Sequence, residues 1–217
     1  MIRLVYVRHG ESNTTVSRAI GGPRTCSGLS PLGIQQAQRL RDRWIEAPEF
    51  TPDLVVSSQY PRAHHTAQII AEAFGSPEVV IDEGFGEHDP GPDCDGMTFA
   101  DFIDRYGTGA WISDPFGVSF PGGETLAEFQ FRVGRAVRRI VDDHAGATVV
   151  VACHGGVIDA VLRQALRMPP TGSFLINTLN TSITEMVLQE SGSWTLRRYG
   201  DVAHLAGLPT ATNLDNS

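Results

Sequence analysis

Cysteine is scarce in this sequence, with three residues among 217 that stand far apart in the chain. An odd and widely spaced set provides neither a disulfide framework nor the ligand spacing of a zinc site. A long apolar run is also missing, because the mostly apolar residues 2–7 are followed at once by Arg8 and His9. Such a segment is too short for a signal sequence or a membrane span. We therefore expect a cytoplasmic protein with no membrane partner.

Positive charge is in deficit. The chain has 17 basic and 25 acidic residues, which gives a formal net charge of −8. Nucleic-acid-binding proteins usually show a basic excess, so we expect no nucleic-acid partner. A small anionic substrate remains compatible with this charge, because its site needs only a few local cations. With 41% hydrophobic residues and ordinary glycine and proline contents, the composition is typical of a globular protein.

Short apolar segments alternate with helical patterns along the chain. Residues 2–7, 54–57, 79–81 and 148–153 have the β-branched, apolar character of buried strands. Helical patterns begin near residues 31, 61, 125 and 157. This alternation predicts an α/β three-layer sandwich with a mostly parallel central sheet and helices on both faces. Two further strands, at 182–188 and 194–199, are expected to form a hairpin that adds an antiparallel edge strand.

Two of the helices carry capping signals at their starts. Ser30 is expected to cap a helix whose first position is Pro31. Thr125 and Glu128 have the spacing of a capping box. In the helix that follows, apolar residues at helical spacing predict the buried side. Arginines are expected to occupy most of the rest of its surface, and these are Arg132, Arg135, Arg138 and Arg139.

Charged and polar side chains follow three of the predicted parallel strands. Arg8 and His9 follow the first strand, Arg62 comes shortly after the second, and His154 follows the strand at 148–153. Ligands of open α/β sheets bind beyond the carboxyl ends of the strands. We therefore expect two arginines and two histidines to meet at one edge of the sheet.

This set of side chains suits a phosphoryl group. Arginine stays charged and presents a planar fork of donors that matches phosphate oxygens. A histidine with a pKa near 6.5 is available as a neutral nucleophile at pH 7, and nearby arginines favour that neutral form. The second histidine is then placed to stabilise charge on the transferring group. Helix N-termini after the strands add N–H donors for an anion.

Several motifs together resemble the histidine phosphatase superfamily, which has the phosphoglycerate-mutase-like fold. In order and spacing they match over nearly the whole chain. The matching pieces are Arg8 to Ser12, Leu29 to Gly33, Ser57-Ser58 with Arg62-Ala63, Pro121 to Glu124, His154 to Gly156, and Asn180 to Ile183.

The resemblance implies a role for individual residues. His9 would be the nucleophile that becomes phosphohistidine, and Arg8, Arg62 and His154 would bind the phosphoryl group. Glu87 stands where the family carries its acid/base carboxylate. No metal and no other cofactor is implied. Three further residues are assigned to the phosphate-binding set: Ser12, Asn13 and Gly155.

The stretch after Glu87 departs from the family pattern, because it is longer, acidic and rich in proline. His88 and Asp89 are therefore further candidates for the acid. A metal site built from His88, Asp89 and Asp93 is the weaker alternative to a solvated acidic loop. Residues 10–29 and 84–96 are expected to be loops, with a short helix at 98–106.

No repeat or linker divides the sequence. We expect a single domain over residues 1–205, with 84–120 as an excursion over the active site and 206–217 as a flexible tail. The expected activity is hydrolysis of a small-molecule phosphate ester. The alternatives are a phosphoglycerate-type mutase and a non-catalytic phospho-ligand-binding or regulatory module. The short chain favours the phosphatase branch, and the family resemblance makes a homodimer an option.

Overall fold

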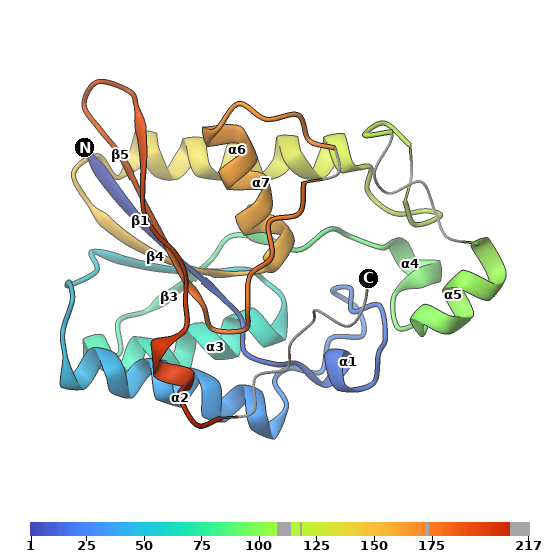
Figure 1. The fold of residues 1–217 in the computed structure, drawn as a ribbon, viewed down its shortest axis with the longest axis horizontal. Helices are drawn as coiled ribbons and strands as arrows, with labels where there is room; N and C mark the ends of the chain where they lie inside the picture. Colours follow the sequence, from blue (N-terminus) through green and yellow to red (C-terminus); the bar gives the residue numbers. More distant parts are fainter. Residues whose placement is uncertain (108–113, 118, 172–173, 209–217) are drawn as a thin grey trace.

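A computed structural model describes residues 1–107, 114–117, 119–171 and 174–208 of the chain. Within these ranges one sheet has the strand order β3-β2-β4-β1-β5-β6 (Figure 1). The first four strands in this order are parallel to one another. Strand β5 pairs antiparallel with both β1 and β6. The mostly parallel sheet with an antiparallel edge is therefore confirmed. The strands are β1 (Ile2–Arg8), β2 (Leu54–Ser57), β3 (Val79–Ile81), β4 (Thr148–Cys153), β5 (Ile183–Leu188) and β6 (Trp194–Asp201).

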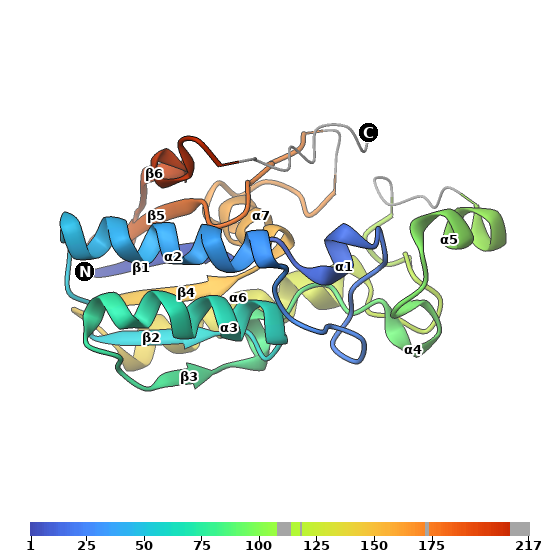
Figure 2. The same cartoon turned by 90° about the horizontal axis from the view of Figure 1, so that it is seen from below.

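Helices cover both faces of this sheet, as the sequence predicts. Helices α2 and α3 lie on one face, and α6 and α7 lie on the other (Figures 1 and 2). Three short helices, α1, α4 and α5, lie at the end of the sheet where the parallel strands finish. None of the described helices is long and apolar enough to cross a membrane. The bounds are α1 (Asn13–Val16), α2 (Pro31–Glu46), α3 (Pro61–Ala71), α4 (Gly91–Cys94), α5 (Phe99–Tyr106), α6 (Leu126–Asp143) and α7 (Gly155–Ala165), with 3-10 turns η1 (Glu72–Phe74), η2 (Glu83–Phe85) and η3 (Ala203–Leu205).

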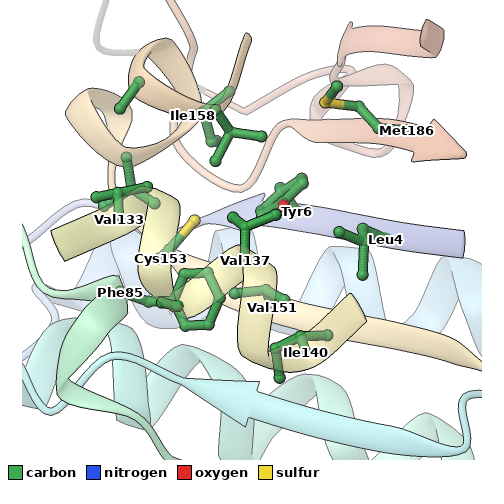
Figure 3. Packing of buried hydrophobic residues seen from close by; sticks show 14 of the residues in the cluster. Leu4, Tyr6, Phe85, Val133, Val137, Ile140, Val151, Cys153, Ile158 and Met186 are labelled. Atoms are coloured by element: carbon green, nitrogen blue, oxygen red, sulfur yellow. The ribbon is translucent and has the colours of Figure 1, made fainter. Parts of the chain in front are cut away.

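The core forms two layers because successive side chains of a strand point to opposite faces. On β1, Val5 and Val7 pack toward Trp44 of α2 in one layer. Leu4 and Tyr6 point the other way, into the layer covered by α6 and α7 (Figure 3). The strands in the middle of the sheet are thus buried on both sides, which explains their continuous apolar sequences.

Both predicted helix caps are present. The Ser30 hydroxyl accepts a hydrogen bond from the Gly33 N–H, with Pro31 in the first turn of α2. Thr125 and Glu128 make the reciprocal bonds of a capping box at the start of α6. These local bonds satisfy N–H groups that a helix start leaves without partners. The first turns of α2 and α6 are therefore stabilised by these caps.

Two segments that the sequence analysis treats as loops contain short helices. Ser12 caps α1, because its hydroxyl accepts a hydrogen bond from the Thr15 N–H. A serine is a common N-cap, so this helix start has a signal within residues 10–29. The 84–96 segment contains part of η2 and all of α4. At the other end of the chain Leu205 is buried in η3. Of the expected tail, residues 209–217 lie outside the described residues.

Candidate active site

His9 comes directly after β1 and is almost completely buried, with 5% of its surface exposed. Its Nδ1 lies 2.7 Å from the carbonyl oxygen of Gly10. A carbonyl only accepts, so Nδ1 carries the proton, and Nε2 keeps its lone pair. Arg62 donates from Nε to that Nε2 over 3.1 Å. The ring is thus held in the tautomer that leaves Nε2 as the nucleophilic atom.

The two predicted arginines both lie close enough to the His9 ring to affect its charge. Arg62, in the first turn of α3, also donates to the carbonyl of Gly21 over 3.0 Å, and its guanidinium lies over the Tyr60 ring. Arg8 donates to the carbonyl of Thr178, while its Nε is buried without a hydrogen-bond partner among the described residues. A buried donor without a partner is costly, so the Arg8 Nε marks a position for a ligand acceptor.

His154 joins His9 in the same pocket. The two ring centroids are 5.0 Å apart, and His154 is fully buried. Its Nε2 pairs with the Ser58 hydroxyl at 2.8 Å, and its Nδ1 has no partner among the described residues. Ser58 follows β2 and His154 follows β4, which are parallel neighbours. The structure therefore brings the ends of three strands together as the sequence predicts.

Burial and positive charge set the protonation of the two histidines. Burial, followed by the charges of Arg62 and Arg8, lowers the pKa of His9 well below its usual value near 6.5. Burial and the same arginines, with a contribution from His9 itself, also lower the pKa of His154. Both rings are therefore neutral at pH 7, which is the form in which an imidazole attacks an electrophile.

Glu87 lies on the segment that follows η2, and its carboxylate contacts the start of α7. Its Oε2 accepts from the backbone N–H of Gly156 over 3.1 Å, in the first turn of α7. Its Oε1 accepts from the N–H of His88 over 3.0 Å. A Cβ atom on Gly156 would lie 2.3 Å from the same carboxylate, so a larger residue there would make the Glu87 side chain move. The carboxylate thus sits beside the residues that follow His154.

The neighbours of Glu87 point elsewhere. The His88 ring packs against Phe120 and Phe129, and its Nε2 pairs with the carbonyl of Glu124. Asp89 accepts from the Gly91 N–H and forms an ion pair with Arg24 at 3.1 Å. Among the described residues no three His, Cys, Asp or Glu side chains are grouped as metal ligands. Of the three candidate acids, Glu87 has the placement that suits proton transfer.

The remaining members of the predicted phosphate-binding set have different surroundings. Gly155 starts α7, and a Cβ there would lie 3.3 Å from the Thr178 hydroxyl and 3.7 Å from the Arg8 Nε, so its backbone faces the pocket. Ser12 is buried, but its hydroxyl is engaged in the cap of α1. Asn13 is exposed and donates to the Ser27 hydroxyl. Asn13 is therefore not brought together with His9 by any described contact.

Hydrogen bonds to the backbone hold the His9 turn in place. The Gly10 N–H donates to the Thr66 hydroxyl at 3.1 Å, and the Asn180 amide donates to the His9 carbonyl at 2.8 Å. A Cβ on Gly10 would lie 2.4 Å from the carbonyl oxygen of Gly33. The turn is therefore held between α2, α3 and the segment before β5, which fixes the position of His9.

Arg132, which was expected on the helix surface, contacts the segment that carries Glu87. Its side chain is only 28% exposed, and its guanidinium binds both the Glu124 carboxylate and the backbone carbonyl of Glu87. A signal was available, because residue 132 lies one turn after the buried Phe129 and directly before the buried Val133. That position borders the apolar side of α6, where a long side chain reaches across its edge.

Comparison with known proteins places this architecture in a family. The histidine phosphatase superfamily (branch 1) model matches residues 4–202. The chain therefore belongs to the histidine phosphatase superfamily.

Named relatives include phosphatases and mutase-like proteins. Phosphoglycerate mutase-like protein 4 of Arabidopsis thaliana is 36% identical over 205 residues, which are 93% of this chain and 86% of that protein. The metal-independent phosphoserine phosphatase of Arabidopsis thaliana is 28% identical over 208 residues, covering 94% of this chain and 84% of that one. A crystal structure of a phosphoserine phosphatase mutant from Entamoeba histolytica, in complex with phosphoserine, is similar with a TM-score of 0.77. It is 27% identical and covers 94% of this chain and 100% of its own.

Proposed function

We propose that the protein is a metal-independent phosphomonoesterase that hydrolyses small phosphorylated molecules through a phosphohistidine on His9. The observation that carries this proposal is the fixed tautomer of His9. Its Nδ1 proton is bound by the Gly10 carbonyl, and its Nε2 lone pair is directed toward the Arg62 guanidinium. A neutral, oriented ring near two arginines is the form that attacks a bound phosphoryl group.

In the first step, the His9 Nε2 lone pair forms a bond to phosphorus while the bond to the ester oxygen breaks. The phosphoryl oxygens take the Nε–H of Arg62, which meets Nε2 in the free protein, and the unpartnered Nε–H of Arg8. Glu87, in its acid form, gives a proton to the leaving oxygen. His154 supports the equatorial oxygens from its side of the pocket.

In the second step, Glu87 acts as the base. Its carboxylate removes a proton from a water molecule, whose oxygen attacks phosphorus as the bond to Nε2 breaks. Phosphate leaves, and His9 returns to its neutral form with the proton still on Nδ1. General acid–base catalysis of this kind contributes about 10²–10⁴-fold. All the groups in both steps come from the chain itself, which is the basis for proposing a reaction without a metal.

The substrate class follows from the kind of site. The phosphoryl pocket is lined by groups that bind any phosphate monoester, and the name of the Arabidopsis thaliana phosphatase supports hydrolysis without metal. A phosphoglycerate-type mutase is the second candidate, because the relative at 36% identity carries a mutase-like name. A mutase must retain its displaced product and return the phosphoryl group to it, whereas a phosphatase passes that group to water.

The first experiment follows phosphate release from an aryl phosphate with a chelator present. We expect turnover to persist, and to be lost in His9→Ala. Activity that disappears with the chelator and returns with a divalent ion would contradict a metal-independent reaction. A parallel assay supplies 3-phosphoglycerate and measures free phosphate and 2-phosphoglycerate together. Faster isomerisation than phosphate release would make the mutase the better assignment.

A further inference from the structure

The guanidinium of Arg132 donates hydrogen bonds to four backbone carbonyls at and just before Glu87, the candidate acid. Its NH1 donates toward the carbonyls of Glu83, Gly84 and Gly86, over 3.3, 3.2 and 3.0 Å. Its NH2 donates to the carbonyl of Glu87 over 3.2 Å. These carbonyls belong to η2 and the residues after it, and that of Glu83 also accepts from the Gly86 N–H. One side chain therefore binds four carbonyls along the stretch that leads to Glu87.

Glu124 completes the set of partners for Arg132. The carboxylate accepts from Nε over 2.9 Å and from NH2 over 2.8 Å, and its side chain is 14% exposed. All five N–H groups of the arginine thus have acceptors nearby. A lysine ammonium has neither the planar fork nor the number of donors to reproduce this arrangement.

Glu124 also binds the other side of the Glu87 segment. Its backbone N–H donates to the Asp89 carbonyl over 2.9 Å, and its own carbonyl pairs with the His88 Nε2. Gly91 and Gly123 pack against this backbone too closely for a Cβ atom. The residues on both sides of Glu87 are therefore joined to the same turn, and that turn is joined to α6 through Arg132.

Tyr60 adds a contact from the direction of the phosphoryl pocket. Its hydroxyl donates to the Glu87 carbonyl over 3.2 Å, so this oxygen has two donors on the protein side. With the backbone fixed there, the side chain is left free to extend to the Gly156 N–H. A proton donor works only within hydrogen-bond reach of the leaving oxygen, and displacement of a catalytic group by about 1 Å lowers rates by up to ~10²-fold.

We propose that Arg132, held by Glu124, is a positioning residue that fixes Glu87 for proton transfer. This inference rests on the proposed function of the site. Arg132 does not touch the reacting atoms, so its effect passes through the backbone of Glu87. Its removal is expected to affect the steps that need Glu87 and to leave the attack by His9 intact.

The test compares two substrates in Arg132→Lys and Arg132→Gln: an alkyl phosphate with a poor leaving group and a nitrophenyl phosphate with a good one. We expect kcat/KM, which covers the steps up to formation of the phosphohistidine, to fall by about 10–100-fold for the alkyl ester and by less than about 5-fold for the aryl ester, since a good leaving group needs little protonation. The same substitutions are then made in a Glu87→Gln background. There we expect almost no further loss, because the group that Arg132 positions is already absent.

Arg138→Gln is the matched control. Arg138 lies on the same helix and forms an exposed ion pair with Asp142 over 2.7 Å, and none of its described contacts is with η2 or the Glu87 backbone. We expect its kinetics to match the unmodified protein with both substrates. If Arg132→Gln fails to fold, as judged by its circular dichroism and thermal transition, Glu124→Gln gives the same test with the arginine in place.

Equal losses with both substrates, or a loss that persists undiminished in the Glu87→Gln background, would overturn the inference. Such results would leave the phosphohistidine reaction standing, because His9→Ala tests that reaction separately. A Glu87→Gln protein as active as the unmodified one on the alkyl ester would instead reject the acid role of Glu87, and the inference with it.

Discussion

His9, Arg62 and His154 follow closely on the ends of three neighbouring strands, whereas Glu87 lies on a segment beyond β3 and η2. We call the first group, together with Arg8, the pocket floor, and residues 86–96 the roof segment. The floor residues His9, Arg62 and His154 have at most 5% of their surface exposed and are placed by the register of the sheet. The roof segment is held by contacts outside the sheet: the Tyr60 and Arg132 side chains donate to the Glu87 carbonyl, the His88 ring pairs with the Glu124 carbonyl, and the backbone of the segment pairs with that of Glu124 and Ile20.

This difference has a consequence for catalysis. The carboxyl ends of the inner strands are rigid, because each of these strands is hydrogen-bonded to a neighbour on both sides. A segment held by a few side chains changes position when one of them is altered. Substitutions in the floor should therefore affect every substrate, whereas changes to Glu87 or to the groups that hold the roof segment should depend on how much help the leaving group needs.

The largest effect is expected for Arg62→Gln in the floor. It removes a charge from the phosphoryl group and the donor that faces the His9 Nε2. We expect kcat/KM to fall by about 10²–10³-fold for both an alkyl and an aryl phosphate. Arg138→Gln, at an exposed ion pair on α6, is the control that should change neither value. If kcat/KM of Arg62→Gln fell for the alkyl ester alone, the floor and the roof segment would not differ in the way proposed.

Glu87→Gln should show the opposite pattern. The amide keeps the shape of the carboxylate but neither gives nor takes the proton. We expect kcat/KM, which reports formation of the phosphohistidine, to fall by roughly 10²-fold or more with a poor leaving group and much less with a good one. Values of kcat/KM over a series of aryl and alkyl phosphates measure this as a steeper dependence on leaving-group pKa. Equal and minor losses across the series would move the acid role to another group.

The protonation of His9 gives a third test, in the protein without substrate. Burial and the charges of Arg62 and Arg8 lower the pKa of this ring, so it should stay neutral when an exposed histidine is already charged. Nuclear magnetic resonance titration of the imidazole nitrogens should show its change well below pH 6.5. In Arg62→Gln the pKa should rise, because one cation is gone. A pKa of 6.5 or above in the unmodified protein would contradict the electrostatic description of the floor.

The same shift has a defined sign for stability. The unfolded chain takes up protons on His9 and His154 near pH 6.5, while the folded chain does not until the pH is far lower. The free energy of unfolding should therefore decrease as the pH falls below about 6.5, by up to ~1.4 kcal/mol per pH unit for each histidine.

The smallest effect on rate is expected at Asp95, at the far end of the roof segment. Its carboxylate accepts from the N–H groups of Gly22 and Arg24 and from the Thr25 hydroxyl. Asp95→Asn should lower the free energy of unfolding by about 1–3 kcal/mol and change kcat less than 10-fold. Denaturant titration checks the first value, and the exposed Asp93→Asn is the matched control. A 100-fold loss of kcat would instead place this end of the segment in the reaction.

The floor was predictable from the sequence because its signals are periodic and local. Apolar strands that end in Arg8-His9 and in His154 have to meet at one sheet edge once the strands are parallel. The family resemblance then added Glu87. The Ser30 and Thr125 caps were likewise readable, since each depends on residues three positions apart.

The roof segment was not predictable in the same way. The bonds of Arg132 to the carbonyls before Glu87 join residues 45 or more positions apart, and they involve backbone atoms that carry no sequence signal. In the sequence, Arg132 therefore could not be distinguished from the other arginines expected on the surface of this helix. Asn13, which the sequence places in the phosphate-binding set, donates to the Ser27 hydroxyl in the structure, and its role stays a prediction.

The central claim is that phosphorus becomes bonded to His9 during turnover, and rapid quenching tests it most directly. Glu87→Gln should slow hydrolysis of the intermediate, so this variant is mixed with an aryl phosphate labelled on phosphorus and quenched in base within milliseconds. We expect the label on the peptide that contains His9, with the acid lability of a phosphorus–nitrogen bond, and no label in His9→Ala. Label on another residue, or full turnover in His9→Ala, would contradict the account.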